Sequence, residues 1–225
     1  MGTRDYRQYC ALPNALDAIG ERWTLLIVRE LCLGPMRYND LIDAMNGIGG
    51  NLLASRLKKL EGLKITEKIL YEGVVHYALT SLGESLRPTV IDLLRWGLNL
   101  LVDTEGQFLG NKKHQRERTD WVVTLIEALA GDVKITDGED QPIYSLVVDE
   151  RPYYAILSNN RLQFRRGEPK GSIKAGLVIT SALIHSIYQK KEKIQSLLRD
   201  NQISTTGKSK ESKKFLKILF PRGDP

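Results

Sequence analysis

A group of polar side chains in residues 47–63 has the chemistry needed to contact a nucleic acid. The group joins one amide, one hydroxyl and three cations: Asn51, Ser55, Arg56, Lys58 and Lys59. Amides and hydroxyls can bond base edges, and Lys and Arg neutralise phosphates. Leu53, Leu57 and Leu60 recur at i, i+4 and i+7, which predicts a helix with one buried side. We expect the polar side to face double-stranded DNA, although ordinary surface helices share this pattern.

The segments on either side of this helix favour a winged helix. Upstream, residues 39–46 follow a Gly34-Pro35 turn, and Asn39 is placed to cap a helix there. Downstream, residues 65–71 and 74–79 flank the dipeptide Glu72-Gly73, which predicts a β-hairpin. Helix, turn, helix and hairpin is the order of a winged helix-turn-helix.

The composition indicates a globular protein with room for two domains. The chain has 225 residues, 42% of them hydrophobic and 27% charged, and a formal net charge of +6. A positive balance favours an anionic partner without requiring one. Residues 103–118 are polar and lack an apolar period. We predict a winged-helix domain over 1–102, a linker over 103–118 and a second domain over 119–225.

The sequence predicts no membrane segment, no metal and no cofactor. The N-terminus lacks the apolar run of a signal peptide, and no window is long and apolar enough to span a membrane, so we expect a cytoplasmic protein. Cys10 and Cys32 are too few for a disulfide framework or a four-ligand zinc site. The histidines are isolated from one another and from the cysteines in the sequence.

Four motifs resemble the HxlR-type winged-helix transcriptional regulators, a MarR-like group, over residues 8–102. They are a cysteine before the first helix, a Gly-x-x-Trp-Thr entry to the second, a Gly-Pro-x-Arg-Tyr turn and an Asn-Leu-Leu-x-x-Arg-Leu helix. The resemblance implies a homodimeric regulator whose recognition helix enters the major groove. It places the polar group defined above at that groove, with Arg37 and Tyr38 near phosphate. Two alternatives stay open: an ion pair of Arg56 within the domain, and a packing role for Tyr38.

The tip of the predicted hairpin departs from the resembling family. Family members commonly carry an arginine there, whereas this chain has Val74 and Val75. Lys68 and His76 are then the nearby candidates for DNA contact. Fewer cations predict weaker contacts of this wing and fewer released counterions.

Residues 82–102 predict a long helix, broken at Pro88, that is too apolar to stay exposed in a monomer. In the resembling family this helix and the N-terminal helix form the two-fold interface. The side chains expected there are Leu86, Leu93, Leu94, Trp96, Leu100 and Leu101. Such a dimer would hold two recognition helices one DNA turn apart, about 34 Å, and read a near-palindromic operator. The alternative is that the second domain covers this patch.

Cys10 matches the cysteine that redox-sensing members of the resembling family use as a switch. A reactive thiol must ionise, and the nearby cations in the sequence are Arg4 and Arg7. Cys10 is therefore a candidate redox residue, and a redox-sensing regulator is an alternative function. Cys32 lies between two leucines, which indicates a core position.

The second domain alternates helices with short β-rich runs. We expect helices over 119–129, 181–189, 192–199 and 209–219, and strands over 133–136, 143–148, 153–157, 161–165, 176–180 and 202–205. This order predicts an α+β domain with a mostly antiparallel sheet.

The element order of this domain resembles the sterol carrier protein type domain, which encloses an apolar lipid-binding tunnel. The resemblance implies a hydrophobic small-molecule effector. Apolar residues at helical spacing are the candidates for lining a cavity, although such residues more often form a core. They are Leu183, Ile184, Ile187, Leu197, Phe215, Leu216 and Leu219.

Enzymes and carriers form the competing class of function. The second domain could hydrolyse, transfer or carry an acyl group or lipid, or bind another protein. However, the sequence has no Gly-x-Ser-x-Gly elbow, no phosphate-binding glycine loop and no dinucleotide fingerprint. We therefore expect a regulator and not an enzyme.

Overall fold

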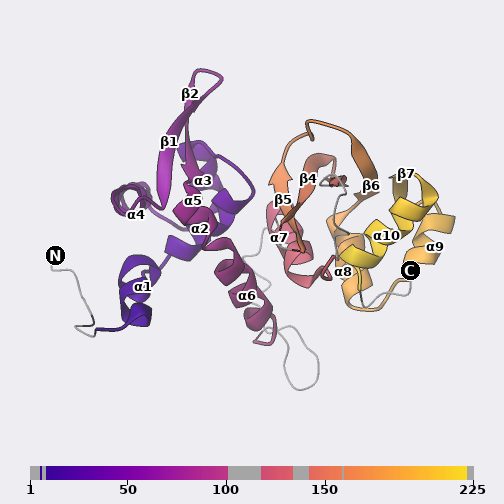
Figure 1. Ribbon diagram of the computed structural model, residues 1–225, viewed down its shortest axis with the longest axis horizontal. Coiled ribbons are helices and arrows are strands. Elements are labelled where there is room, and N and C mark those ends of the chain that lie inside the picture. The colour runs from indigo at the N-terminus through magenta and orange to yellow at the C-terminus, as the bar shows by residue number, and fades with distance from the viewer. Residues whose placement is uncertain (1–5, 7–8, 101–117, 134–141, 159, 222–225) are drawn as a thin grey trace. The chain divides into compact units, whose positions relative to one another are not determined.

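The computed structural model describes residues 6, 9–100, 118–133, 142–158 and 160–221 (Figure 1). The chain divides into two compact units, residues 1–90 and 91–225. The division falls inside one helix, α6 (Arg87–Leu98). The expected boundary at residue 102 stays a prediction. The predicted linker and the strand expected at 133–136 lie almost wholly outside the described residues.

The N-terminal unit is helical with one small hairpin. Its helices before the hairpin are α1 (Ala11–Ile19), α2 (Thr24–Cys32), α3 (Tyr38–Ala44) and α4 (Gly50–Gly62). The hairpin strands β1 (Thr66–Tyr71) and β2 (Val74–Leu79) follow, and then α5 (Ser81–Glu84) and the start of α6. This is the winged helix-turn-helix order that the sequence predicted.

Apolar spacing explains how the N-terminal unit is held together. Leu53, Leu57 and Leu60 of α4 are buried in one core with residues of α2 and α3. The hairpin turns at Glu72-Gly73, where both residues have positive φ, 48° and 75°, as a tight two-residue turn requires. A backbone bridge between Met36 and Tyr77 ties β2 to the segment before α3. The core and this bridge fix α4 relative to the hairpin.

Two local expectations for this unit were wrong. Asn39 does not cap α3, because the helix begins at Tyr38 and its N-cap is Arg37. Pro88 does not break the helix after the hairpin. The interruption falls between Glu84 and Arg87, and Pro88 occupies the first turn of α6, where its missing N–H costs no hydrogen bond.

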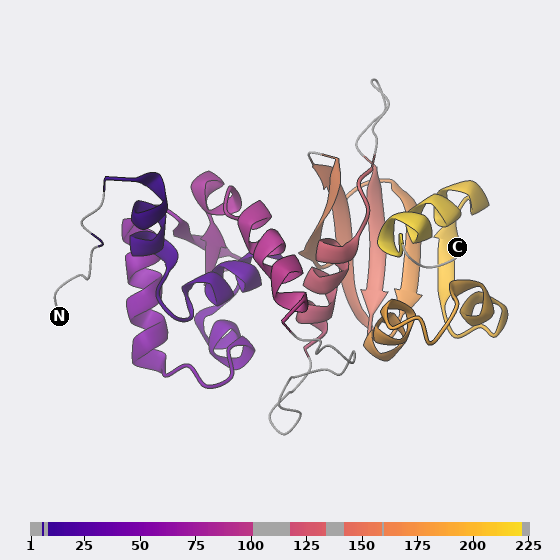
Figure 2. The same ribbon diagram turned by 90° about the horizontal axis from the view of Figure 1, so that it is seen from below.

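The C-terminal unit contains a five-stranded sheet with helices packed on one face (Figures 1 and 2). Its strands are β3 (Ile143–Val148), β4 (Arg151–Ser158), β5 (Arg161–Arg166), β6 (Ile173–Ile179) and β7 (Ser204–Gly207). Its helices beyond α6 are α7 (Thr119–Leu129), α8 (Ser181–Tyr188), α9 (Ile194–Arg199) and α10 (Ser209–Leu219).

The strand order in this sheet is β5-β4-β3-β6-β7. Neighbouring strands are antiparallel except β3 and β6, which are parallel. The expected mostly antiparallel α+β arrangement is therefore present. Side chains on the helix-covered face are buried, and Phe215 of α10 stacks on Tyr144 of β3 with ring centroids 4.5 Å apart. Within the described residues, no helix is long and apolar enough to cross a membrane.

Candidate nucleic-acid interface

Helix α4 presents a polar side to solvent opposite its buried leucines. Asn51, Ser55 and Lys58 are exposed and lie at i, i+4 and i+7, which places them on one side of the helix. We call these three residues the outer face of α4. An amide, a hydroxyl and an ammonium are thus available together on a helix anchored by its core side. This is the arrangement that reading a DNA groove requires.

Arg56 and Lys59, also expected at the groove, are instead paired within the unit. The Arg56 guanidinium forms an ion pair with Glu21, and Lys59 Nζ lies 2.8 Å from Glu21 Oε1. Lys59 Nζ also donates to the carbonyl of Asp17 at 2.7 Å. The alternative role for Arg56 is therefore the one observed. The hydrogen bond from Lys59, aided by the charges of both cations, outweighs partial burial and lowers the pKa of Glu21.

Arg37 and Tyr38 differ in their availability at the start of α3. Arg37 is exposed, so it can reach a phosphate. The Tyr38 hydroxyl donates to the carbonyl of Gly50 at 2.7 Å, which links the first turns of α3 and α4. Tyr38 therefore positions α4 rather than offering its hydroxyl to DNA.

The hairpin carries few groups that could bind DNA. Lys68 is exposed, and its ammonium lies 3.3 Å from the Glu61 carboxylate and 5.4 Å from the centroid of the Tyr77 ring. His76 is buried, with Nδ1 3.0 Å from the carbonyl of Val74, which does not favour the expected DNA contact by His76. The strand ends beside the Glu72-Gly73 turn expose apolar side chains, including Leu70 at 75% of its surface.

The residues expected at the dimer interface differ in how far they are exposed. Leu93, Trp96 and Leu100 are exposed, with Trp96 at 61%, and Leu94 is half-buried. Leu86 is half-buried and packs against the core of the N-terminal unit. Leu101 lies outside the described residues. On α1, Leu12 and Leu16 are also exposed apolar side chains.

Cys10 is exposed at the N-cap of α1, and Cys32 is buried at the end of α2. Exposure makes Cys10 accessible to an oxidant, whereas the burial of Cys32 agrees with a core position. In the part of the chain that the structure describes, no group of three or more His, Cys, Asp or Glu side chains could hold a metal ion.

The residues expected to line a cavity are mostly core residues of the C-terminal unit. Leu183 is half-buried, and the other six are buried: Ile184, Ile187, Leu197, Phe215, Leu216 and Leu219. Their burial fits packing between the helices and the sheet. A cavity role for them stays a prediction.

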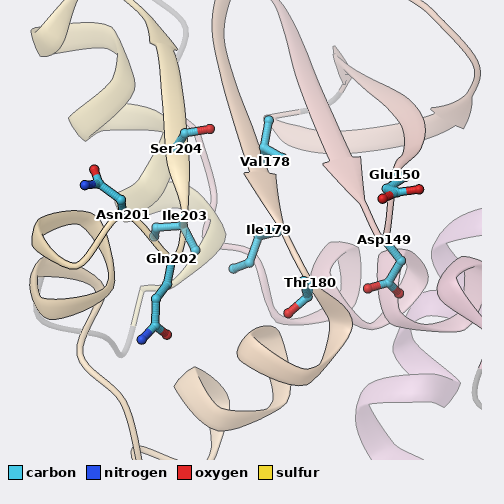
Figure 3. Close-up of a pocket in the computed structure, with 9 residues that line it drawn as sticks. All are labelled: Asp149, Glu150, Val178, Ile179, Thr180, Asn201, Gln202, Ile203 and Ser204. Carbon is cyan, nitrogen blue, oxygen red and sulfur yellow. The ribbon is translucent and has the colours of Figure 1, made fainter.

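A pocket of about 430 Å³ lies elsewhere in the C-terminal unit, beside the ends of β3 and β6 (Figure 3). Asp149, Glu150 and Thr180 line one part of it, and residues 201–204 line the other. Asp149 accepts hydrogen bonds from the Ser181 N–H at 2.9 Å and the Ser181 hydroxyl at 2.7 Å, at the first turn of α8. Burial acts to raise the pKa of Asp149, but these hydrogen bonds outweigh it, and the pKa is lowered. The carboxylate is therefore already engaged at the helix terminus.

Glu21 is the site residue that the sequence did not reveal. It lies far from α4 in the chain, and an isolated acidic residue in a turn gives no periodic signal. Its position near the Trp23 turn could have suggested a pairing role, but the partners on α4 become evident only when the unit is folded.

Comparisons with known proteins agree on the N-terminal part of the chain. The profile of the HxlR-like helix-turn-helix family matches residues 18–105. An uncharacterized HTH-type transcriptional regulator of Mycobacterium tuberculosis (strain CDC 1551 / Oshkosh) is 35% identical over 107 residues, which are 46% of this chain and 67% of that protein. Another from Synechocystis sp. (strain PCC 6803) is 30% identical over 95 residues, 41% of this chain and 70% of that protein.

A solved structure is also similar to part of the chain. A protein described as a MarR-family transcriptional regulator from Porphyromonas gingivalis W83 is 31% identical and covers 40% of this chain and 92% of its own, with a TM-score of 0.38. The matched family and the sequence relatives are transcriptional regulators and not enzymes, which confirms that expectation.

Proposed function

Because the chain belongs to the HxlR-like helix-turn-helix family of transcriptional regulators, we propose that it reads an operator in double-stranded DNA through the outer face of α4. The observation that carries this proposal is the exposure of Asn51, Ser55 and Lys58 on a helix whose other side is anchored in the core. Asn51 and Ser55 are placed to bond base edges, while Lys58 and Arg37 bind phosphates. Because a transcriptional regulator must reach chromosomal DNA, we propose a cytoplasmic location.

A homodimer is the second part of the proposal. Leu93, Trp96 and Leu100 of the α6 region expose apolar surface that a second copy of the chain would cover. A two-fold dimer presents two copies of α4 to successive turns of one duplex, about 34 Å apart. The operator is then near-palindromic.

A hydrophobic effector for the C-terminal unit is the third part. The central parallel pair β3–β6, the single helical layer and the closing helix α10 support a sterol-carrier-like arrangement. In that arrangement an apolar ligand enters between the helices and the sheet. It changes DNA binding only through different affinities for two dimer geometries.

Redox sensing through Cys10 is the second candidate function. The exposure of Cys10 at the start of α1 favours it, because an accessible thiol can react with an oxidant or form an intersubunit disulfide. A peroxide-treated protein that keeps its operator affinity, and a Cys10→Ser variant that behaves identically, would remove this candidate.

Fluorescence anisotropy tests the DNA-binding proposal. The probes are a duplex from upstream of the protein's own gene and a scrambled duplex of the same length, each titrated at several salt concentrations. We expect the upstream duplex to bind more tightly. Lys58→Ala should weaken binding to both duplexes and reduce the slope of log K against log salt by about 0.9 for each phosphate that the variant no longer neutralises.

Lys170→Ala is the matched control, because it removes the same charge from an exposed position of the C-terminal unit. It should leave the slope unchanged. Equal effects of Lys58→Ala and Lys170→Ala, or binding to neither duplex at low salt, would contradict the proposed role of α4.

A further inference from the structure

The C-terminal part of α1 and the segment that joins it to α2 hold two cations of α4 in place. Lys59 Nζ donates to Glu21 Oε1 at 2.8 Å and to the Asp17 carbonyl at 2.7 Å. The Arg56 guanidinium pairs with the other Glu21 carboxylate oxygen, Oε2, and its Nε donates to the Arg22 carbonyl at 3.4 Å. We call the Glu21 carboxylate and the two carbonyls the α4 clamp. It joins residues far apart in the sequence on one flank of the helix.

Different groups of the α4 clamp orient the two cations and neutralise their charge. The two backbone carbonyls are dipoles that orient Lys59 and Arg56, and they leave the positive charges uncompensated. Glu21 carries the negative charge that offsets them. Its pKa is lowered, with the Lys59 hydrogen bond as the largest cause, so it is ionised at neutral pH. Replacing Glu21 with the neutral, similarly shaped Gln should therefore unmask charge without moving the helix.

The two clamped cations remain at the surface. The side chains of Arg56 and Lys59 are 19% and 28% exposed, and both lie on the flank next to the outer face of α4. With Glu21 in place, Lys58 is the cation of α4 that faces solvent without this partner. The positive charge that α4 offers to phosphates is thus smaller than its sequence indicates.

We propose that Glu21 restrains sequence-independent binding by masking two of the three cations on the recognition helix. The inference rests on the proposed function of α4. Phosphate neutralisation contributes essentially all of non-specific affinity, whereas base contacts by the outer face discriminate between sequences. Masking Arg56 and Lys59 lowers the non-specific affinity and leaves the base contacts unchanged. The ratio of operator affinity to non-specific affinity rises as a result.

The experiment compares the salt dependence of binding to a scrambled duplex for the full chain and for Glu21→Gln. Neutralising one or two more phosphates per protomer steepens the slope by about 0.9 to 1.8. For each protomer bound, affinity should then fall about 3.5- to 12-fold more than for the unaltered chain between 50 and 200 mM salt. Asp43→Asn is the matched control, since it removes one negative charge from an exposed position of α3 outside the α4 clamp.

Adding Arg56→Gln and Lys59→Gln to Glu21→Gln should abolish the gain, because no masked cation is left to release. Thermal unfolding of each variant checks that the fold is retained. The proposal is overturned when Glu21→Gln, folded, changes the slope no more than Asp43→Asn does, or lowers non-specific affinity. The proposed function is contradicted by a different result: Lys58→Ala, made in the chain that keeps Glu21, leaves the slope of log K against log salt unchanged.

Discussion

Asn51 is the residue whose replacement should report most directly on base recognition. It is exposed in the first turn of α4, and an asparagine amide can bond the N6 and N7 groups of adenine together. Asn51→Ala should cost about 1–3 kcal/mol of operator binding at a single base-pair position.

A panel of operators, each changed at one base pair, locates that position by anisotropy. The variant should have lost preference at one position and kept it at the others. A uniform loss across the panel would instead assign Asn51 to phosphate contact.

Asp120 joins α7 to the sheet in the C-terminal unit. Its carboxylate accepts hydrogen bonds from the Tyr153 hydroxyl at 2.7 Å and from Arg166 Nε at 3.2 Å, and Arg118 lies 3.4 Å away. Burial acts to raise the pKa of Asp120, but the Arg166 charge, the Tyr153 hydrogen bond and the Arg118 charge together outweigh it. The pKa is lowered. Burial and the same carboxylate raise the pKa of Tyr153, which stays a hydrogen-bond donor at neutral pH.

Stability should therefore depend on pH through Asp120. Because the folded-state pKa lies below the unfolded value of about 3.9, the contribution is complete above that pH and is lost as the pH falls through the folded-state pKa. Asp120→Asn should lower the free energy of unfolding by about 3 kcal/mol at pH 7, since it removes the buried negative charge that accepts hydrogen bonds from Tyr153 and Arg166. The difference from the unaltered chain should shrink toward pH 3.

Urea denaturation followed by circular dichroism at pH 7 and pH 3 measures the free energy of unfolding of each variant. Asp132→Asn is the control, because Asp132 and Arg161 form an exposed pair 3.2 Å apart, which contributes at most about 1 kcal/mol. Equal losses for the two variants, or a loss that grows on acidification, would contradict the role given to Asp120.

At the scale of elements, Thr80 joins the end of β2 to α4 and α5. Its hydroxyl accepts from the Gly83 N–H at 3.1 Å, which caps α5, and donates to the Lys64 carbonyl at 2.5 Å, just after α4. Thr80→Ala should lower the free energy of unfolding by about 1–2 kcal/mol, because it removes the cap and the second hydrogen bond. Thr80→Ser keeps the hydroxyl and should recover most of that loss in the same urea titration. A serine variant as unstable as the alanine variant would show that the methyl group matters more than the hydrogen bonds.

Elements with a local signal were predictable from the sequence, and those set by distant contacts were not. The leucine period of α4 and the Glu72-Gly73 turn are local, and both appear as expected. The start of α3 was misjudged because Asn39 has the chemistry of a cap, yet the backbone becomes helical one residue earlier. Strand pairing in the C-terminal sheet depends on the crossover that places β6 beside β3, which no short stretch encodes.

The candidate site was predictable to a similar extent. The outer face of α4 follows from helical spacing. The pairing of Arg56 and Lys59 with Glu21 and the burial of His76 do not, because each is decided by a neighbour that the fold supplies. The sequence therefore predicted more positively charged side chains available for DNA contact than the folded unit exposes.

At the scale of the whole molecule, the exposed apolar side chains of α6 predict the oligomeric state. Trp96→Glu places a charge at the centre of the proposed interface, where burial without a partner is costly. The protein should shift from dimer to monomer in multi-angle light scattering. Its affinity for a two-half-site operator should fall more than its affinity for a single half-site.

Thr89→Glu adds the same charge to an exposed position near the start of α6 and should remain dimeric. A Trp96→Glu protein that keeps the dimer mass would move the interface to other surfaces, such as the exposed leucines of α1.

The parallel pairing of β3 with β6 also has a consequence during synthesis. As the chain leaves the ribosome, β3, β4 and β5 can pair through successive hairpins, but the second edge of β3 has no partner until β6 (Ile173–Ile179) has emerged. Until then a strand rich in valine, leucine and isoleucine offers unpaired backbone groups to other nascent chains. Pausing of translation between β5 and β6 should therefore increase aggregation, and faster elongation through that stretch should improve the yield of native protein.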